Sequence, residues 1–324
     1  MSARAQRGAA LLMAMLTVAL ISTLAAAGLW QQWRSVEVEA AERMRTQASW
    51  VLTGALDWAR LILREDGRIG GADHLAEPWA VPLQEARLST FLAADREAST
   101  DGSDAENAFL SGDITDLQSR LNINNLIEGG RVSATGLRSF QRLFSALGLP
   151  ESQLDQMAEA LRVATQISTE ASSGDPAPLA PQQTGQLAWL GVPAATIAAL
   201  EPYVTVLPAR TPVNVNTASA QAIYAAINGI SLADAQRLVT TRQSAHFRSL
   251  SDVSRQLSGH EAAVTEGQAA IASRFFEVRG RLRLDNTLIE ERSVVQRDGT
   301  DVRTLMRERV AGGSSTQQQP AGLR

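Results

Sequence analysis

The sequence predicts an α+β protein that begins with one long helix, continues through a helical middle and ends in strands. The uncharged apolar run 9–29 is followed to about residue 64 by apolar residues at three- and four-residue spacing, with no proline, which is typical of one continuous helix. Shorter amphipathic segments with glycine and proline stops occupy much of 134–244. From residue 275, apolar and charged residues alternate, as in a half-buried strand.

The first part of the long helix is suited to crossing a membrane. A bilayer-spanning helix needs roughly 20 apolar residues, and 9–29 supplies such a run. Arg4 and Arg7 precede it, so the positive-inside bias keeps the N-terminus cytoplasmic and exports the rest of the chain. Trp30 and Trp33 follow where indole rings prefer the membrane interface. We therefore predict a single-pass membrane protein with an exported C-terminal domain.

Two interpretations of this N-terminus compete. In one, it is a secretory signal peptide that is cut after the small residues 25–27, so that the mature chain starts at Gly28. In the other, it is a type IV pilin-like leader that ends at Gly8, and the helix from Ala9 is retained. The unbroken helical pattern beyond the apolar run favours the second interpretation. A helix over 9–64 would be about 80 Å long at 1.5 Å per residue.

Composition narrows the classes of function. The 324 residues can hold one anchor and about two domains, and the net charge of −4 gives no general attraction to nucleic acid. There is no cysteine, so no disulfide contributes to stability. His74, His246 and His260 are far apart in the sequence, and we expect each to be an isolated surface residue. No phosphate loop, nucleophile elbow or metal-ligand spacing favours an enzyme.

An acidic, glycine-containing stretch covers 93–120. Calcium takes six to eight oxygen ligands in flexible geometry, which such a loop can supply. The spacing matches no EF-hand, and a solvated acidic loop is the alternative. Just before it, EPWAVPL (77–83) is expected to be extended because of its prolines. The candidate calcium ligands are Asp101, Asp104, Glu106, Asp113 and Asp116.

Two asparagine-containing motifs precede helical pairs. In DLQSRLNINNL (116–126), the asparagines predict a short strand or turn that ends in a helix N-cap. Helices follow, with a polar, proline-rich linker at 169–186. In 211–253, NVNT leads to a helix capped by Thr217 or Ser219, an Asn-Gly turn, and a helix capped by Ser231.

This second arrangement resembles a helix-hairpin-helix, or SAM-like, unit. Such units often bind the DNA backbone, but 205–280 holds seven arginines against five acids, short of a basic face. A packing module is therefore the preferred interpretation. At the end of the chain, Asp298-Gly299 lies between two strand-like runs and predicts a hairpin.

Taken in order, the leader ending at Gly8, the retained helix, DLQSRLNINNL, PVNVNTA with its hairpin, and the terminal strands resemble the K-type minor pseudopilins of bacterial type II secretion, the general secretion pathway protein K family. The resemblance spans nearly the whole chain. It implies that a prepilin peptidase cuts between Gly8 and Ala9 and methylates the new amino end.

The resemblance also implies a fold. The long N-terminal helix would pack on a small antiparallel pilin-like sheet, and a large all-α, SAM-like or helix-hairpin-helix-like domain would be inserted between sheet elements. The implied parts are the leader (1–8), the transmembrane (9–29) and periplasmic (30–64) parts of the helix, a pilin-like part with the acidic loop (65–120), the inserted domain (121–272), the C-terminal strands (273–311) and a disordered tail (312–324).

Proteins of this family lie at the tip of a periplasmic pseudopilus and are thought to start or limit its assembly during export of folded proteins across the outer membrane. The implied partners are the I-type and J-type minor pseudopilins, the prepilin peptidase, the inner-membrane secretion platform and secreted substrates, with calcium in the head and no nucleic acid. The implied location is the inner membrane, with a cytoplasmic N-terminus and a periplasmic C-terminal domain.

Met13 stands at mature position five, where major pilins carry a glutamate and the K class an uncharged residue. A carboxylate at the bilayer centre costs roughly 2.5–3.5 kcal/mol on insertion scales. A tip subunit has no neighbour above it to pair such a charge, so Met13 fits that position. Ala9 departs from the phenylalanine that pilins usually carry at their mature start. The alternatives are a membrane-anchored helix-hairpin-helix DNA-binding competence protein and a signal-anchored periplasmic protein of another function.

Overall fold

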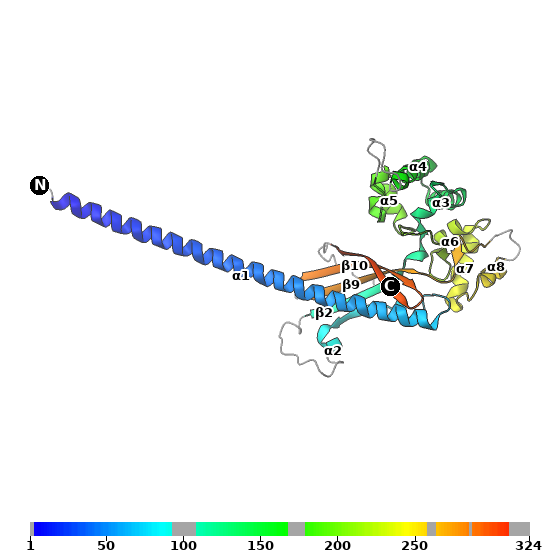
Figure 1. The fold of residues 1–324 in the computed structure, drawn as a ribbon, viewed down its shortest axis with the longest axis horizontal. Coiled ribbons are helices and arrows are strands. Elements are labelled where there is room, and N and C mark those ends of the chain that lie inside the picture. Colours follow the sequence, from blue (N-terminus) through cyan, green and yellow to red (C-terminus); the bar gives the residue numbers. More distant parts are fainter. Residues whose placement is uncertain (1–2, 93–107, 168–178, 258–263, 285–286, 311–324) are drawn as a thin grey trace, which may run out of the picture. The chain divides into compact units, whose positions relative to one another are not determined.

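The computed structural model describes residues 3–92, 108–167, 179–257, 264–284 and 287–310 of the chain (Figure 1). These fall into two compact units, Met1–Gly54 and Ala55–Arg324. The predicted tail, 312–324, and most of the linker at 169–186 lie outside the described residues.

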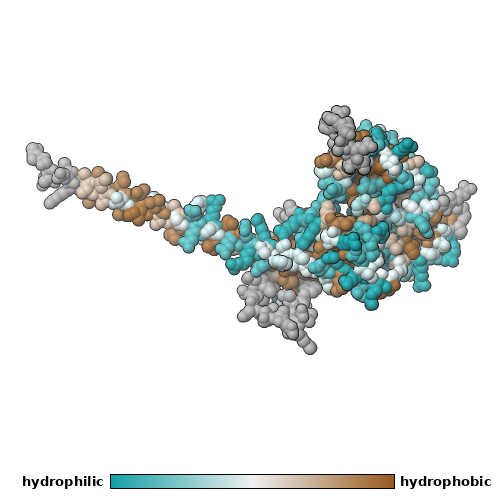
Figure 2. All heavy atoms as spheres, viewed as in Figure 1, coloured by the Kyte–Doolittle hydropathy of each residue, from teal (hydrophilic) through white to brown (hydrophobic). Residues whose placement is uncertain are grey.

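The first unit is entirely helical in its described part. It belongs to α1, Ala3–Ile69, which is the one helix of the described chain that is long and apolar enough to cross a membrane. Figure 2 shows apolar residues gathered along the N-terminal part of this helix. The helix extends five residues beyond the expected end near residue 64, and Gly70 follows it with φ +68°, a conformation that glycine adopts without strain.

A five-stranded antiparallel sheet forms the body of the second unit, in the order β1-β2-β9-β10-β11. The predicted strand over 275–284 and the hairpin at Asp298-Gly299 are both confirmed. The pairing of β2 with β9 joins two parts of the chain that are far apart in sequence. The strands are β1 (Leu83–Arg87), β2 (Ala108–Asp116), β9 (Phe275–Leu284), β10 (Thr287–Asp298) and β11 (Asp301–Val310).

The last turns of α1 pack on one face of this sheet. Leu56, Ala59 and Leu63 form an apolar cluster with residues of the 3₁₀ turn η1 (Pro78–Ala80) and of strands β9 to β11, including Phe276. At Gly67 the helix backbone lies close to the β10–β11 turn, because a Cβ atom there would lie 2.2 Å from the carbonyl oxygen of Gly299. Only a residue without a side chain allows this contact.

The segment 77–83 was expected to be extended, and that prediction is wrong for its first half. Pro78–Ala80 forms the 3₁₀ turn η1, and β1 begins only at Leu83. The turn places Trp79 in the core, where it is 1% exposed, and its indole N–H donates to Glu77 at 2.8 Å. Burial of this aromatic side chain outweighs the local preference for extended backbone.

Helices fill the chain between β2 and β9, and one continuous apolar cluster joins them. Their predicted caps are confirmed at Ser219 and Ser231, and Ser133 and Ser249 cap two more. The elements are η3 (Leu117–Ser119), β3 (Leu121–Asn122), η4 (Ile123–Leu126), β4 (Ile127–Glu128), β5 (Arg131–Val132), α3 (Ala134–Leu147), α4 (Glu151–Ile167), η5 (Thr184–Leu190), α5 (Ala194–Leu200), β6 (Val204–Thr205), β7 (Val213–Asn214), α6 (Ala220–Ala226), α7 (Leu232–Ser244), α8 (Leu250–Gln256) and β8 (Ala269–Ala270); α2 (Leu88–Leu92) follows β1.

Candidate functional site

The polar junction between the sheet and the helical segment centres on Asp116, the last residue of β2. Its carboxylate accepts hydrogen bonds from the backbone N–H of Gln118 (2.7 Å) and from the hydroxyls of Thr217 (2.6 Å) and Ser273 (2.7 Å). The side-chain amide of Asn214 adds a donor at 3.1 Å. Burial raises the pKa of Asp116, and these hydrogen bonds oppose the rise. The junction thus surrounds one buried carboxyl group with a local donor, Gln118, and with donors from two distant parts of the chain.

Asn214 and Asn216, from the NVNT motif, hold this junction together. The Asn214 amide also donates to the Asp73 carbonyl (3.2 Å) and to the Ser273 hydroxyl (2.9 Å). Asn216 donates to the Phe247 carbonyl and accepts from the Phe247 N–H, both at 2.9 Å. The motif therefore connects the turn between α7 and α8 to the ends of the sheet strands.

The NINN motif performs a related task within the helical segment. Asn122 accepts from the Leu207 N–H (3.1 Å) and donates to the Ala209 carbonyl (2.7 Å). Asn125 pairs with the backbone of Thr211 through both ends of its amide, at 2.7 and 3.1 Å. The predicted strand that ends in an N-cap is confirmed, because Asn122 ends β3 and caps η4. What the sequence missed is that these side chains clamp a backbone segment more than 80 residues away.

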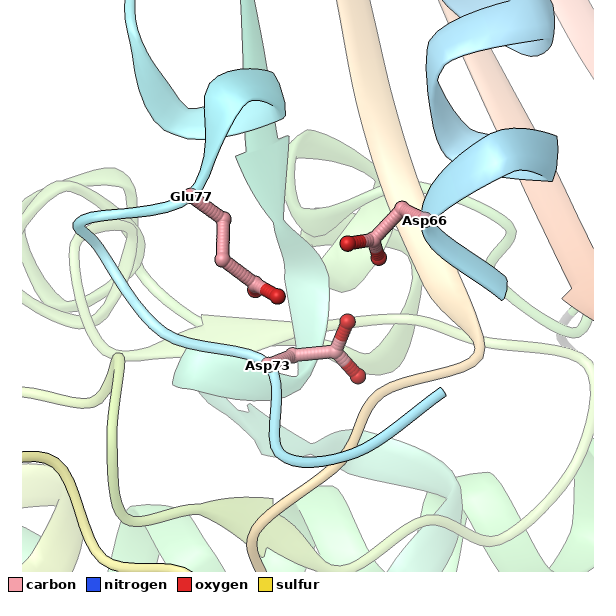
Figure 3. A group of neighbouring side chains, drawn as sticks. All are labelled: Asp66, Asp73 and Glu77. Carbon is pink, nitrogen blue, oxygen red and sulfur yellow. The ribbon is translucent and has the colours of Figure 1, made fainter. Parts of the chain in front are cut away.

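Beside the junction, three carboxylates lie close together, and two of them, Asp66 and Asp73, pair with Arg297. Asp66, Asp73 and Glu77 point toward one another (Figure 3), and one oxygen of each lies within 4.8 Å of the others. Arg297 donates to Asp66, to Asp73 at 2.6 Å and to the carbonyl of Ser273 at 2.9 Å. These residues line a cavity of about 150 Å³. We call Asp66, Asp73 and Glu77, together with Arg297, the acidic pocket. Among the described residues, these three acids are the one group of histidine, cysteine or acidic side chains that could hold a metal ion.

Burial perturbs two of these carboxyl groups. Desolvation raises the pKa of Asp73 to about 6, although Arg297 lowers it in part. Desolvation likewise raises the pKa of Glu77 to about 7, opposed by hydrogen bonds from the His74 N–H and the Trp79 indole. Three acids lie close together and only two of them pair with the arginine, so protonation reduces the repulsion among them.

The expectation of isolated surface histidines is wrong for two of the three. His74 and His246 stack with their ring centroids 3.7 Å apart and their planes at 12°. The pair connects the loop after α1 to the turn between α7 and α8. Burial and the neighbouring His246 lower the pKa of His74. His260 lies outside the described residues.

The structure places the predicted calcium ligands as follows. Asp101, Asp104 and Glu106 lie outside the described residues. Asp113 forms an ion pair with Arg281 at 3.0 Å, on the sheet. Asp116 lies in the buried junction. The acidic pocket was not anticipated, because its three acids carry no recognisable metal-binding spacing in the sequence.

At the N-terminus, Gly8 and Ala9 both belong to α1, and Met13 is 66% exposed on the candidate membrane-spanning stretch. Cleavage between Gly8 and Ala9 stays a prediction, as does methylation of Ala9.

In the hairpin between α6 and α7, the side chain of Asp234 occupies the N-terminus of α7. Asp234, which is 2% exposed, accepts from the backbone N–H of Ser231 at 2.8 Å and pairs with Arg237. The backbone N–H groups of Ser231 and Asp234, which could otherwise bind a phosphate at this helix N-terminus, thus already have acceptors within the chain. This geometry does not favour the DNA-binding alternative.

A candidate membrane-spanning helix, an antiparallel sheet and a long helical segment between two of its strands define a class of membrane-anchored α+β protein. Two family models, both for type II secretion system protein K, match residues 119–209 and 213–272. Both matches lie between β2 and β9 and contain the two asparagine motifs. In both of these segments the chain is similar to type II secretion system protein K.

Relatives match almost end to end. The type II secretion system protein K of Pseudomonas aeruginosa is 28% identical, over 96% of this chain and 95% of the relative. That of Klebsiella pneumoniae is 27% identical, over 91% and 93%. A similar fold occurs in the crystal structure of the GspK-GspI-GspJ complex from the type 2 secretion system of enterotoxigenic Escherichia coli, with a TM-score of 0.57 and 17% identity, covering 84% of this chain and 99% of that one.

Proposed function

We propose that this chain is a minor pseudopilin that lies at the tip of the type II secretion pseudopilus, where it starts or limits assembly and serves export of folded proteins across the outer membrane. The observation that carries the proposal is an apolar face on α1 that points away from the sheet. Trp58 and Leu61 are 50% and 49% exposed, while Leu56 and Leu63 on the same turns are buried. A helix with apolar residues on both sides fits packing between the sheet and other long helices.

The partners follow from the same reasoning. The E. coli relative is named in a complex with GspI and GspJ, and we propose that the I-type and J-type minor pseudopilins cover Trp58 and Leu61 of this chain. Further partners are the inner-membrane secretion platform and the secreted substrates. The role is structural, with no catalytic step.

Membrane insertion and processing complete the proposal. The N-terminus lies in the cytoplasm, the spanning helix in the inner membrane and the rest in the periplasm. A prepilin peptidase cuts between Gly8 and Ala9. Met13 avoids placing a carboxylate in the bilayer where no subunit above could pair it. Gly8→Ala should leave the chain unprocessed and block secretion, and a mature start at Gly28 in the natural protein would contradict the pilin-like pathway.

Calcium binding in the head also belongs to the proposal. The acidic pocket offers the oxygen ligands that calcium prefers, but Arg297 already pairs with Asp66 and Asp73, and a cation there would have to displace it. We therefore assign calcium to the acidic stretch 93–120. Millimolar calcium should raise the thermal midpoint of the protein, and Asp101→Asn with Asp104→Asn should remove that rise. A rise that survives in this double variant but disappears in Asp66→Asn would place the ion in the acidic pocket instead.

Co-purification tests the tip complex. The double variant Trp58→Arg, Leu61→Arg adds charge to the exposed face of α1 and leaves the buried face intact. It should lose the I-type and J-type partners and block secretion, with unchanged circular dichroism. Gln236→Arg, at an exposed position on α7, is the matched control and should retain both. A full complex with the double variant would contradict the proposal.

A further inference from the structure

We propose that a pocket between α3 and the α6–α7 hairpin binds a compact oxyanion, a carboxylate or phosphate group. The pocket has a volume of about 210 Å³. It lies between the two segments that the family models match, so its ligand would connect them. The polar residues that line it include Thr135, Arg138, Ser139, Arg142, Asn228 and Gln268.

Arg142 is held rigidly at this pocket without a counter-charge. Its guanidinium donates to the carbonyls of Tyr224 (2.9 Å) and Ile230 (2.7 Å) and lies 4.0 Å from the centroid of the Tyr224 ring. Among the residues that the structure describes, no carboxylate is near enough to shift the pKa of Arg142. Burial lowers the pKa of Arg142, and the neighbouring Tyr224 opposes this lowering in part.

Arg138 adds a second positive charge one helical turn away. Its Nε donates to the backbone carbonyl of Ala134 at 3.2 Å, and the side chain is exposed. It has no carboxylate within ion-pair distance in the described part of the chain either. Two arginines at i and i+4 repel each other, so one anion between Arg138 and Arg142 would relieve both charges.

The other helices of this segment show that the arrangement on α3 is unusual. In α4, α7 and α8 an acid stands three residues before an arginine and pairs with it. On α3 the same positions hold Thr135 before Arg138 and Ser139 before Arg142, so hydroxyl donors replace the acids. The three paired sets are Glu159 with Arg162, Asp234 with Arg237 and Asp252 with Arg255.

The size and chemistry of the pocket select the ligand. Sites for drug-sized molecules occupy about 300–1,000 Å³, so this smaller pocket fits a single oxyanion rather than a nucleotide or a sugar. Guanidinium, hydroxyl and amide groups all donate hydrogen bonds, and arginine forms its strongest ones with carboxylate and phosphate oxygens. The ligand is either free phosphate or a carboxylate on a peptide.

Anion titration of the purified full chain in detergent micelles tests the pocket. Inorganic phosphate and acetate replace chloride at constant ionic strength, and binding is followed by calorimetry. We expect saturable binding that weakens about tenfold in Arg138→Gln, because a charge-assisted hydrogen bond is lost. Arg138 is exposed, so this variant should fold. Arg162→Gln is the matched control on α4 and should bind as the natural chain does.

Two peptides distinguish the sources of the anion. Acetyl-Ser-Glu-Ser-amide should displace phosphate if a protein carboxylate is the natural ligand, whereas acetyl-Ser-Gln-Ser-amide should not. Displacement by neither peptide, with phosphate bound, would assign free phosphate. Equal phosphate and acetate binding by Arg138→Gln and the natural chain, or no saturable binding, would overturn the inference. Binding of a DNA duplex in place of these small anions would overturn it as well. The titration uses the chain without partners, so its outcome is independent of the tip complex.

Discussion

The two asparagine motifs, NINN and NVNT, form the same local turn but hydrogen-bond to different kinds of group. In each, an asparagine ends a two-residue strand and accepts from the backbone N–H two residues later, at 3.1 Å for Asn122 and 3.0 Å for Asn214. The remaining bonds of Asn122 reach neutral groups around 207–211, whereas Asn214 donates to the buried carboxylate of Asp116. The same local turn therefore closes a neutral loop in one place and stabilises a buried charge in the other.

The largest effect on stability should come from removing the hydrogen bond between Asn214, in the NVNT motif, and the Asp116 carboxylate. Asn214→Leu keeps the volume of the side chain but leaves Asp116 one donor short. Because an under-paired buried carboxylate is costly, we expect a loss of about 3–4 kcal/mol of unfolding free energy. Asn122→Leu removes bonds to neutral groups only, which are backbone atoms and the Thr211 hydroxyl, and should cost about 2 kcal/mol. Thermal unfolding of both variants measures the difference, and equal losses would contradict the distinction between the motifs.

A substitution in α3 can also disturb the NINN motif. A Cβ atom on Gly136, in α3, would lie 2.1 Å from the carbonyl oxygen of Asn125. Replacing glycine by alanine in a helix normally stabilises it by up to about 1 kcal/mol, but here the clash with backbone should reverse the sign and cost about 2 kcal/mol. Gly54→Ala is the matched control, because nothing lies within 4 Å of its Cβ position. A stabilising Gly136→Ala would show that α3 shifts away freely.

The acidic pocket beside the Asn214–Asp116 junction should make the stability of the protein depend on pH. The pKa of Glu77 is about 7 in the folded chain, compared with 4.5 in the unfolded chain. Its contribution to stability is therefore complete below pH 4.5 and is lost as the pH rises through 7. Glu77→Gln should remove the part of the fall in stability between pH 4.5 and 7 that Glu77 causes. It should add on the order of 1 kcal/mol at pH 8, because solvent screens this half-buried group.

Unfolding midpoints across that pH range measure the effect of Glu77→Gln. Asn122→Leu serves as the control, because it should keep the pH dependence of the natural chain. Parallel curves for the natural chain and Glu77→Gln would assign the pH dependence to another group.

The smallest effect should come from the histidine pair. The pKa of His74 is lowered in the folded chain, so its contribution to stability is present above pH 6.5 and is lost as the pH falls through the folded-state pKa. His246→Ala removes one cause of this lowering. The pKa of His74, measured by NMR, should then rise toward 6.5; an unchanged value would leave burial as its sole cause.

Local signals in the sequence predicted the elements but not their long-range partners. The serine caps, the Asp298-Gly299 hairpin and the turn at Asn122 depend on neighbouring residues, and each was predictable. The bond from Asn214 to Asp116 and the His74–His246 stack join residues about 100 and 170 positions apart. Such contacts leave no periodicity in a single sequence, so the junction and the acidic pocket required the structure.

Site-specific cross-linking in cells that carry the whole secretion system tests the tip assignment most directly. The natural chain has no cysteine, so Trp58→Cys introduces one attachment point on the exposed face of α1 for a maleimide photo-cross-linker. We predict adducts with the I-type or J-type minor pseudopilin from this position and none from the matched control Gln236→Cys on α7. Absence of these adducts from Trp58→Cys, or equal yields from both positions, would contradict a tip complex built on this face of α1.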